Sequence, residues 1–362
     1  MKKILALIIA LTMAISFAAC AKDTLDISEE PATDETLRVA LLINGVLGDK
    51  SFFDSADRGL QMAKEKHGGK LEYTSIEMTT DETKWLPTLY DYADNPEWDI
   101  IIVGTSQMRG PLMEVAPLYP DKKFFIFDQD LDFGAGELDN VYSIMYKQNE
   151  GAFLVGVVAA RLSETKIIGF LGGVENPIVN DFLIGYIEGA KYVEEDIKVV
   201  ISYVGSFENR LKGQELALSQ YQQSGVDIGF NAAGISGLGQ IDAACEVEKF
   251  AIGVDSDQAL IFGEPTANYI PTSMLKNVDL SILRAIDLHL GGDLVYGAVE
   301  TLGLTEDGVG LAHNGYYQKL VPQRVRDEVE RLADMILNGE IEVGSSFGKT
   351  NEDIQAIKDS VK

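Results

Sequence analysis

The amino-acid sequence predicts an α/β protein with two lobes, each built on a doubly wound parallel sheet. From residue 37 onward, short runs rich in Ile, Val and Phe alternate with longer amphipathic runs. Near-continuous apolar runs are typical of parallel strands that helices cover on both faces. These runs fall into two sets, and 362 residues is the length of about two domains. Two lobes in one chain are therefore the expected organisation.

The first residues have the composition of a bacterial lipoprotein signal. Lys2 and Lys3 precede an apolar stretch that reaches Ala19, directly before Cys20. That stretch is too short for a spanning helix, and it fits a secretory signal peptide over residues 1–19. Small residues before the cysteine resemble a lipobox, so we expect lipidation of the Cys20 thiol. An ordinary signal peptide with an incidental cysteine is the alternative.

Residues 20–36 are polar and acidic, and we expect them to be a tether between the lipid anchor and the folded body. The whole chain has 57 acidic against 30 basic residues, a formal net charge of −27. This acidity argues against nucleic acid as a partner, because phosphate contacts need a cationic face. It argues more weakly against anionic ligands such as nucleotides. No later apolar run is long enough to span a membrane, so we expect an anchored rather than a spanning protein.

Metal and cofactor signals are weak or missing in the sequence. With two cysteines and three histidines, a disulfide framework or a Cys/His zinc cluster is not expected. The stretch Asp128 to Gly134 departs from a calcium loop in its glycine and in its final acid. There is no phosphate-binding GxxxxGK[ST] loop and no GxSxG elbow. We therefore expect no cofactor, no metal and no catalysis, although paired carboxylates of the glycosidase kind remain open because they need only spatial proximity.

The expected strands are defined by their apolar runs. They lie at 38–43, 71–77, 100–103, 123–127 and 141–145 in the first set, and at 166–170, 198–204, 228–231, 250–254 and 269–275 in the second. Helices are expected between them, for example where Val278, Ile282 and Ile286 recur at a spacing of four.

In open parallel sheets, ligands bind at the carboxyl ends of the strands. Small, polar or acidic residues follow nearly every expected strand, although turns and helix caps alone would also favour them. Asp255 and Asp257 follow the strand FAIGV, where a carboxylate can accept hydrogen bonds from a vicinal diol. Lys276 closely follows another strand and could balance that charge. The segment Gly104 to Gln107 has no interpretation at this level.

Three aromatic residues lie at expected strand ends or just beyond them. Phe52, Phe207 and Phe230 could stack on a flat ligand, and core packing is an equally good interpretation of each.

Several segments together resemble the basic membrane lipoprotein family. They include GDKSFFDSADRGL (48–60), NVYSIMYKQNEGAFLVGVVAA (140–160), IGFLGGVENPIVNDFLIGYIEGAKYV (168–193), VGSFENRLKGQELA (204–217), NAAGISGLG (231–239), IGVDSDQ (252–258) and TSMLKNVD (272–279). The likeness runs from about residue 37 to residue 345 with its motifs in family order. That family comprises purine-nucleoside receptor lipoproteins, which are substrate-binding components of ABC importers.

The resemblance implies a type I periplasmic-binding-protein fold, in which two lobes joined by three hinge crossings close on a ligand. We expect the N-terminal lobe at residues 37–146 with about 258–310. The C-terminal lobe is expected at 147–257 with about 311–362. Such proteins bind and release a ligand without catalysis.

The resemblance also implies roles for individual residues. Phe52 would stack on the base, with Phe230 as the first candidate and Phe207 as the second for the facing aromatic. Asp257 would hold the ribose hydroxyls, with Asp255 as a possible partner. Lys276 and Asp128 match further family positions; Asn44, Asp49 and Gly234, in or beside the matching segments, complete the expected site.

Two departures from the family pattern leave the identity of the base open. Phe53 stands where Asn is usual, and Asn44 precedes Gly45 where the family commonly has Asp. An amide can both donate and accept a hydrogen bond, whereas a carboxylate only accepts.

We therefore predict a nucleoside-binding protein, with a purine favoured. It would be lipid-anchored on the extracytoplasmic face of a bacterial membrane, and it would serve an ABC permease and its ATPase as a monomer. The alternatives are a protein of the same fold that binds a sugar or a signal molecule, a sensor lipoprotein that feeds a histidine kinase, and a surface-anchored hydrolase.

Overall fold

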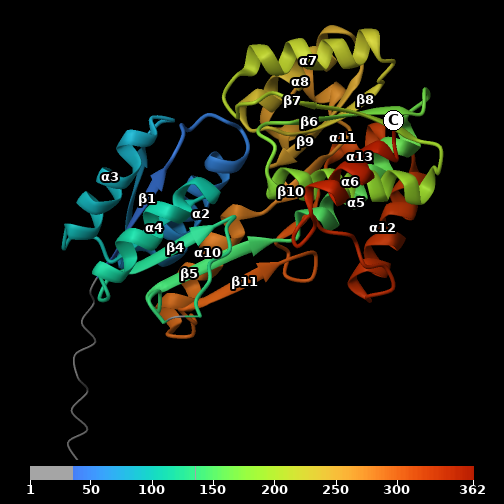
Figure 1. Cartoon of the computed structure of the whole chain (residues 1–362). Helices are drawn as coiled ribbons and strands as arrows, with labels where there is room; N and C mark the ends of the chain where they lie inside the picture. The colour runs from blue at the N-terminus through green and yellow to red at the C-terminus, as the bar shows by residue number, and fades with distance from the viewer. Residues whose placement is uncertain (1–35, 135) are drawn as a thin grey trace, which may run out of the picture. The chain divides into compact units, whose positions relative to one another are not determined.

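The computed structural model describes residues 36–134 and 136–362, and within them the chain forms two six-stranded sheets (Figure 1). The expected signal peptide, Cys20 and nearly all of the expected tether lie outside the described residues. Each sheet has helices on both faces, so the predicted α/β fold with two doubly wound lobes is confirmed.

The first sheet is entirely parallel, in the order β11-β5-β4-β3-β1-β2. Its strands are β1 (Leu37–Ile43), β2 (Leu71–Glu77), β3 (Ile100–Gly104), β4 (Lys123–Phe127), β5 (Val141–Tyr146) and β11 (Ala298–Leu302), and its helices are α2 (Phe52–His67), α3 (Glu82–Asp94), α4 (Arg109–Val115) and α10 (Val278–Gly291). Alternate side chains of β1 enter different cores: Val39 and Leu41 pack with α2 and α10, whereas Ala40 and Leu42 pack with α3 and α4. Burial on both faces explains why the run is continuously apolar.

The second sheet has the order β12-β10-β9-β8-β6-β7, and only the pairing of β12 with β10 is antiparallel among the described pairs. Its strands are β6 (Ile167–Gly172), β7 (Lys198–Tyr203), β8 (Ile228–Ala232), β9 (Phe250–Asp255), β10 (Ser273–Lys276) and β12 (Val309–Leu311). The helices of this lobe are α5 (Gln148–Leu162), α6 (Pro177–Val193), α7 (Arg210–Gln223), α8 (Ile235–Glu246), α9 (Gln258–Phe262), α11 (Gly315–Leu320), α12 (Gln323–Leu337) and α13 (Asn351–Asp359). Figure 1 shows α7 and α8 on one side of this sheet and α5 and α6 on the other.

The chain passes between the two sheets three times. It leaves the first sheet after β5, returns after β10 and leaves again between β11 and β12. The sequence placed the return at about residue 258, but α9 and β10 belong with the second sheet because β10 pairs with β9. The segment expected to start a strand at Tyr269 is instead a 3₁₀ turn, Thr266–Tyr269. Only residues from α10 to β11 return to the first lobe, because α10 packs on α2 and β11 pairs with β5.

Local sequence signals explain where several helices begin. Asn176 accepts a hydrogen bond from Val179 N, and Pro177 occupies the first position of α6, where its missing N–H is not needed. Thr350 and Asp353 form a reciprocal capping box at α13. These caps fix the helix starts that the apolar spacing alone leaves imprecise.

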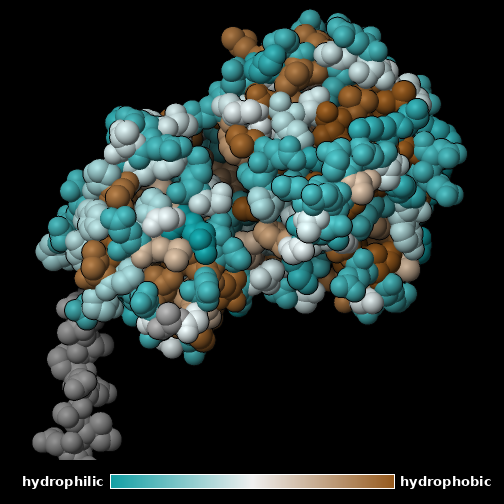
Figure 2. Space-filling model, viewed as in Figure 1, coloured by the Kyte–Doolittle hydropathy of each residue, from teal (hydrophilic) through white to brown (hydrophobic). Residues whose placement is uncertain are grey.

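Among residues 36–134 and 136–362, no helix is both long and apolar enough to cross a membrane. On the face drawn in Figure 2, hydrophobic atoms form separate groups within a largely hydrophilic surface. The most exposed large apolar side chains are Leu211 on α7 and Val295 between α10 and β11, which belong to different lobes. Such dispersed residues are ordinary for a folded protein surface.

Helices α5 and α6 approach closely because glycines remove side chains from their contact. A Cβ atom on Gly189 would lie 1.9 Å from the Phe153 oxygen, and one on Gly185 would lie 2.1 Å from the Asn149 oxygen. Backbone atoms cannot move aside as a flexible side chain can, so this packing requires glycine at both positions.

We expect Gly189→Ala to lower the free energy of unfolding by about 3 kcal/mol, because the added methyl group overlaps the backbone of α5. Urea denaturation measures the loss. The matched control is Gly110→Ala in α4, where nothing lies within 4 Å of the added atom. Since alanine favours helices over glycine, the control should be as stable as the parent or more stable by up to about 1 kcal/mol. Equal losses in the two variants would contradict the close packing of α5 and α6.

Candidate ligand-binding site

A cavity of about 450 Å³ lies where strand ends from both sheets meet. From the first lobe it is lined by residues that follow β1, β3 and β4, and from the second by residues at the ends of β7, β8, β9 and β10. The members of the expected site that line it are Asn44, Asp49, Phe52, Asp128, Phe207, Gly234, Asp255 and Lys276. The volume falls in the usual range for small-molecule sites.

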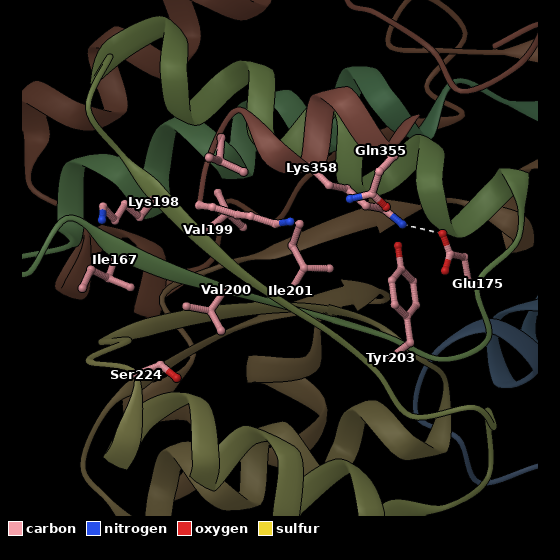
Figure 3. Close-up of a pocket in the computed structure, with 12 residues that line it drawn as sticks. Ile167, Glu175, Lys198, Val199, Val200, Ile201, Tyr203, Ser224, Gln355 and Lys358 are labelled. Atoms are coloured by element: carbon pink, nitrogen blue, oxygen red, sulfur yellow. Dashed lines mark hydrogen bonds and ion pairs between the residues drawn. The ribbon is translucent and has the colours of Figure 1, made fainter. Parts of the chain in front are cut away.

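A second cavity, of about 620 Å³, lies along strand β7 at the edge of the second sheet, beside α13 (Figure 3). Lys358 of α13 points towards Glu175, forms an ion pair with it, and lies over the Tyr203 ring with 4.7 Å between Nζ and the ring centroid. The chain end closes part of this edge, because Val199 N donates to Val361 O. This cavity is away from the carboxyl ends of most strands, so we take the first one as the candidate site.

Among the described residues, Lys276 is the only lysine that lines the candidate cavity, and it is 1% exposed. Its ammonium group pairs with the Asp128 carboxylate. Its Nζ also lies 5.1 Å from the ring centroids of Tyr146 and Phe182 and 5.6 Å from that of Phe52. An ion pair that is buried among aromatic rings is held in one geometry but carries a large desolvation cost.

Asp255 ends β9 as a buried carboxylate beside this ion pair. Burial raises the pKa of Asp255 to about 7, and nearby Asp49 and Asp128 add to the rise, while Lys276 and a hydrogen bond from the Ser51 hydroxyl oppose it. A carboxyl group whose pKa is raised in a cavity by burial and by its neighbours is typical of a functional site.

Asp49 organises the loop that carries Phe52. It accepts hydrogen bonds from the backbone N–H groups of Ser51 at 3.0 Å, Phe53 at 2.8 Å and Asp54 at 3.1 Å. Burial raises the pKa of Asp49 to about 6 despite these three bonds. Since the bonds occupy both carboxylate oxygens, Asp49 positions the start of α2 in this structure.

The same loop contacts the second lobe directly. The Ser51 hydroxyl donates to Asp255 Oδ2, and the Ser256 hydroxyl donates to Ser51 O at 3.2 Å. Gln258 Nε2 donates to Lys50 O, also at 3.2 Å. These contacts join the lobes beside the cavity, so a change in lobe separation would alter the surroundings of Asp255.

Three residues at strand ends have a left-handed backbone that is unusual for residues other than glycine. They are Thr105 with φ of 70°, Asp128 with φ of 60° and Asp255 with φ of 62°, and all three line the cavity. This conformation is least favourable for a β-branched residue such as Thr105. Because strained residues of this kind cluster at functional sites, the backbone supports the same location as the cavity does.

Only one of the two aromatic candidates from the second lobe reaches the cavity. Phe207 lines it, and its ring lies where a Cβ atom on Gly173 would be. Phe230, the first candidate, is wrong as a cavity residue: it is fully buried, with its ring centroid 5.2 Å from that of Tyr186 and 5.9 Å from that of Phe170. It lies in the middle of β8 rather than at its end, so it faces the core.

The two aspartates of the Asp255–Asp257 pair also have different places. Asp257 caps α9 by accepting from Leu260 N and accepts further hydrogen bonds from Asn314 Nδ2 at 2.7 and 2.9 Å. It does not line the cavity, whereas Asp255 does. The preference for Asp257 over Asp255 is therefore corrected, because β9 ends at Asp255 and the next residues turn to start a helix.

Sequence reasoning missed cavity residues that come from helices. Phe182 and Ile178 reach it from α6, and Trp85 from α3. A helical residue near a strand end gives no signal of its own, because the apolar face of the helix looks the same along its length. The Asn-Pro cap that starts α6 beside the cavity is the one local feature that could have indicated it.

Two parallel-sheet lobes with three crossings and a polar, aromatic cavity at their strand ends define a periplasmic-type solute-binding protein. Residues 36–346 match the family described as ABC transporter substrate-binding protein PnrA-like, and the chain belongs to this family. The predicted resemblance is thereby confirmed, and members of this family bind solutes for ABC transport.

Individual relatives agree with this assignment. The chain is 35% identical over 349 residues to basic membrane protein A1 of Borrelia garinii subsp. bavariensis, covering 94% of this chain and 96% of the relative. It is 32% identical over 291 residues to an uncharacterized lipoprotein of Pyrococcus furiosus, covering 76% and 70%. A solved ABC transporter solute-binding protein of Aeropyrum pernix K1 superposes with a TM-score of 0.77 at 25% identity, covering 90% of this chain and 99% of that one.

Proposed function

We propose that this chain is a lipid-anchored, extracytoplasmic receptor that binds a nucleoside, with a purine favoured, and delivers it to an ABC permease and its ATPase. The observation that carries the proposal is the set of side chains that line the cavity. Phe52 and Phe207 offer aromatic rings from different lobes, while Asp255 and Lys276 offer a carboxylate and an ammonium group. A nucleoside combines a flat base, which stacks on aromatic rings, with a vicinal diol that a carboxylate can bind.

The charges favour a nucleoside over a nucleotide. Among the described residues, Asp49, Asp128 and Asp255 line the cavity together with one lysine, Lys276, which is paired with Asp128. A phosphate would therefore enter a negative environment within a chain of net charge −27. A ligand that bridges both lobes would favour the closed state, which is the form delivered to a permease. Lipidation of Cys20 would keep the receptor at the membrane.

The direct test is to identify what binds. Ligand released from the purified protein by denaturation is analysed by mass spectrometry, and isothermal titration then compares nucleosides, nucleotides, free bases and sugars. We expect purine nucleosides to bind best and to be recovered unchanged. A sugar as the only ligand would support the alternative within this fold, and a chemically altered nucleoside would support a hydrolase.

A matched pair of variants tests whether the nucleoside binds in this cavity. Phe207→Ala should weaken nucleoside binding about 10- to 100-fold, because base stacking on an aromatic ring contributes about 1–3 kcal/mol. Phe347→Ala removes an aromatic ring that is 40% exposed and outside the cavity, and binding should be unchanged. Equal affinities for the two variants would place the ligand elsewhere.

A further inference from the structure

The loop between β6 and α6 borders both cavities. Val174 and Asn176 line the candidate cavity, whereas Glu175, which stands between them, lines the second cavity. Asn176 caps α6, and further residues of the candidate cavity come from the first two turns of this helix, namely Ile178, Val179 and Phe182. We call residues 174–182 the α6 wall. Because Glu175 is covalently joined to two cavity residues, a contact that holds Glu175 also fixes their place in the cavity.

Lys358 of α13 holds the α6 wall at Glu175. The Lys358 ammonium group forms an ion pair with the Glu175 carboxylate, drawn as a dashed line in Figure 3. The Lys358 side chain is only 10% exposed, although that of Glu175 is half exposed. A buried ammonium group that lacks a carboxylate partner is costly, so the pair ties the loop to α13.

Lys358 also reaches the α6 wall through Tyr203 of β7. Figure 3 shows the Tyr203 side chain pointing towards the ion pair, and Lys358 Nζ lies 4.7 Å from the centroid of its ring. The Tyr203 hydroxyl donates to Oδ1 of Asn180, a buried residue of α6, at 2.7 Å. A cation over an aromatic ring is attracted to it, so one lysine is connected to the α6 wall by two routes.

The chain just before α13 contacts the same wall. The Ser345 hydroxyl donates to Asp181 Oδ1 at 2.6 Å, and Ser346 N donates to the same oxygen at 2.8 Å. The Ser346 hydroxyl donates to Pro177 O at 2.5 Å. None of Ser345, Ser346 and Lys358 lines the candidate cavity, so the α6 wall is supported from outside it.

We propose that Lys358 is a positioning residue for the candidate site: it holds the α6 wall through Glu175 and Tyr203, and this raises the affinity for the nucleoside. A wall that is already in place need not be ordered by the ligand, and this preorganisation favours binding. The residues that match the family end at 346, so α13 lies beyond them. The inference rests on the proposed nucleoside function and adds a role in binding for this C-terminal helix.

The test measures the affinities of inosine and adenosine for the full-length protein by isothermal titration. Lys358→Met should weaken binding about three- to tenfold, because the ligand must then order the α6 wall itself. Lys358→Arg should bind within about twofold of the parent, because a guanidinium group can also pair with a carboxylate and lie over an aromatic ring.

A second variant breaks the ion pair from its exposed side. Glu175→Gln should weaken binding about as much as Lys358→Met does, and it should fold because the Glu175 side chain is half exposed. The double variant should bind no more weakly than Lys358→Met alone, because both substitutions act through one contact. Additive losses would overturn the inference.

The matched control removes another ion pair of the same lobe. Arg161 pairs with Glu328 between α5 and α12, and neither residue lines the candidate cavity. Arg161→Met should lower stability but leave the affinities unchanged, because a less stable protein that stays folded keeps its site. Equal weakening in Arg161→Met and Lys358→Met would overturn the inference while leaving the nucleoside function intact, and so would parental affinity in Lys358→Met. Binding of neither nucleoside by the parent would overturn the proposed function and the inference with it.

Discussion

Lys276→Met is expected to lower the free energy of unfolding by about 3–5 kcal/mol and to abolish ligand binding. Lys276 is buried, and its ammonium group is the partner of the Asp128 carboxylate. Removing one member of a buried ion pair leaves the other charge in the interior without compensation. Here the remaining carboxylate would also lie near Asp255, whose pKa Lys276 now helps to lower. Urea denaturation measures the stability, and calorimetry measures the binding.

A second substitution separates the two effects. Asp128→Asn in the Lys276→Met background removes the uncompensated charge, and asparagine tolerates the left-handed backbone at this position. We expect the double variant to recover most of the lost stability but none of the binding. Lys84→Met is the control, because Lys84 is 57% exposed and its pair with Asp81 should contribute less than about 1 kcal/mol. A single variant as stable as this control would contradict the importance of the buried pair.

The sequence predicted the central strands well because burial on both faces makes them continuously apolar. The edge strands β2 and β7 were also predicted, whereas the edge strands β11 and β12 lack this property and were missed. In β11 half-buried and exposed positions alternate and only Leu302 is buried, and β12 has only three residues and pairs antiparallel with β10. The grouping of strands put residues 269–275 in the second set, where β10 belongs, but the lobe bounds implied by the family resemblance put them in the first lobe.

The sequence could predict those residues of the candidate site whose position depends only on the direction of the strands. Residues directly after strands, such as Asn44 and Asp128, line the cavity because the carboxyl ends of parallel strands share one edge. The sequence could not show that Asp255 rather than Asp257 faces the cavity, or that Phe207 replaces Phe230. Those differences depend on where a strand ends, and a shift of one or two residues changes what a side chain contacts.

Asp255→Asn is expected to stabilise the ligand-free protein at neutral pH while weakening nucleoside binding. The pKa of Asp255 rises from its usual 3.8 to about 7 in the folded protein. Well below pH 3.8 the carboxyl is protonated in both the folded and the unfolded chain, so its pKa shift imposes no penalty. As the pH rises to about 7, only the unfolded chain ionises readily, and the folded state loses on the order of 4 kcal/mol of stability.

The variant removes this pH-dependent loss. An asparagine oxygen can still accept the Ser51 hydroxyl, but the amide has no charge to desolvate. The difference in unfolding free energy between variant and parent should therefore be small at pH 4 and grow through pH 7. Asp49 titrates in a similar range and interacts with Asp255, so a smaller part of this difference reports Asp49. Asp257→Asn, which keeps the cap of α9, should change stability by less than about 0.5 kcal/mol at any pH.

Asp255 destabilises the folded protein at neutral pH, and a role in ligand binding would explain why a carboxylate stands at this position. If Asp255 accepts the ribose hydroxyls, nucleoside affinity should fall at least about tenfold in Asp255→Asn, because charge-assisted hydrogen bonds are roughly twice as strong as neutral ones. Asp257→Asn should bind as the parent does. Stability gained together with unchanged affinity would mean that Asp255 has no role in binding, and a stability difference independent of pH would mean that its charge is not the cause.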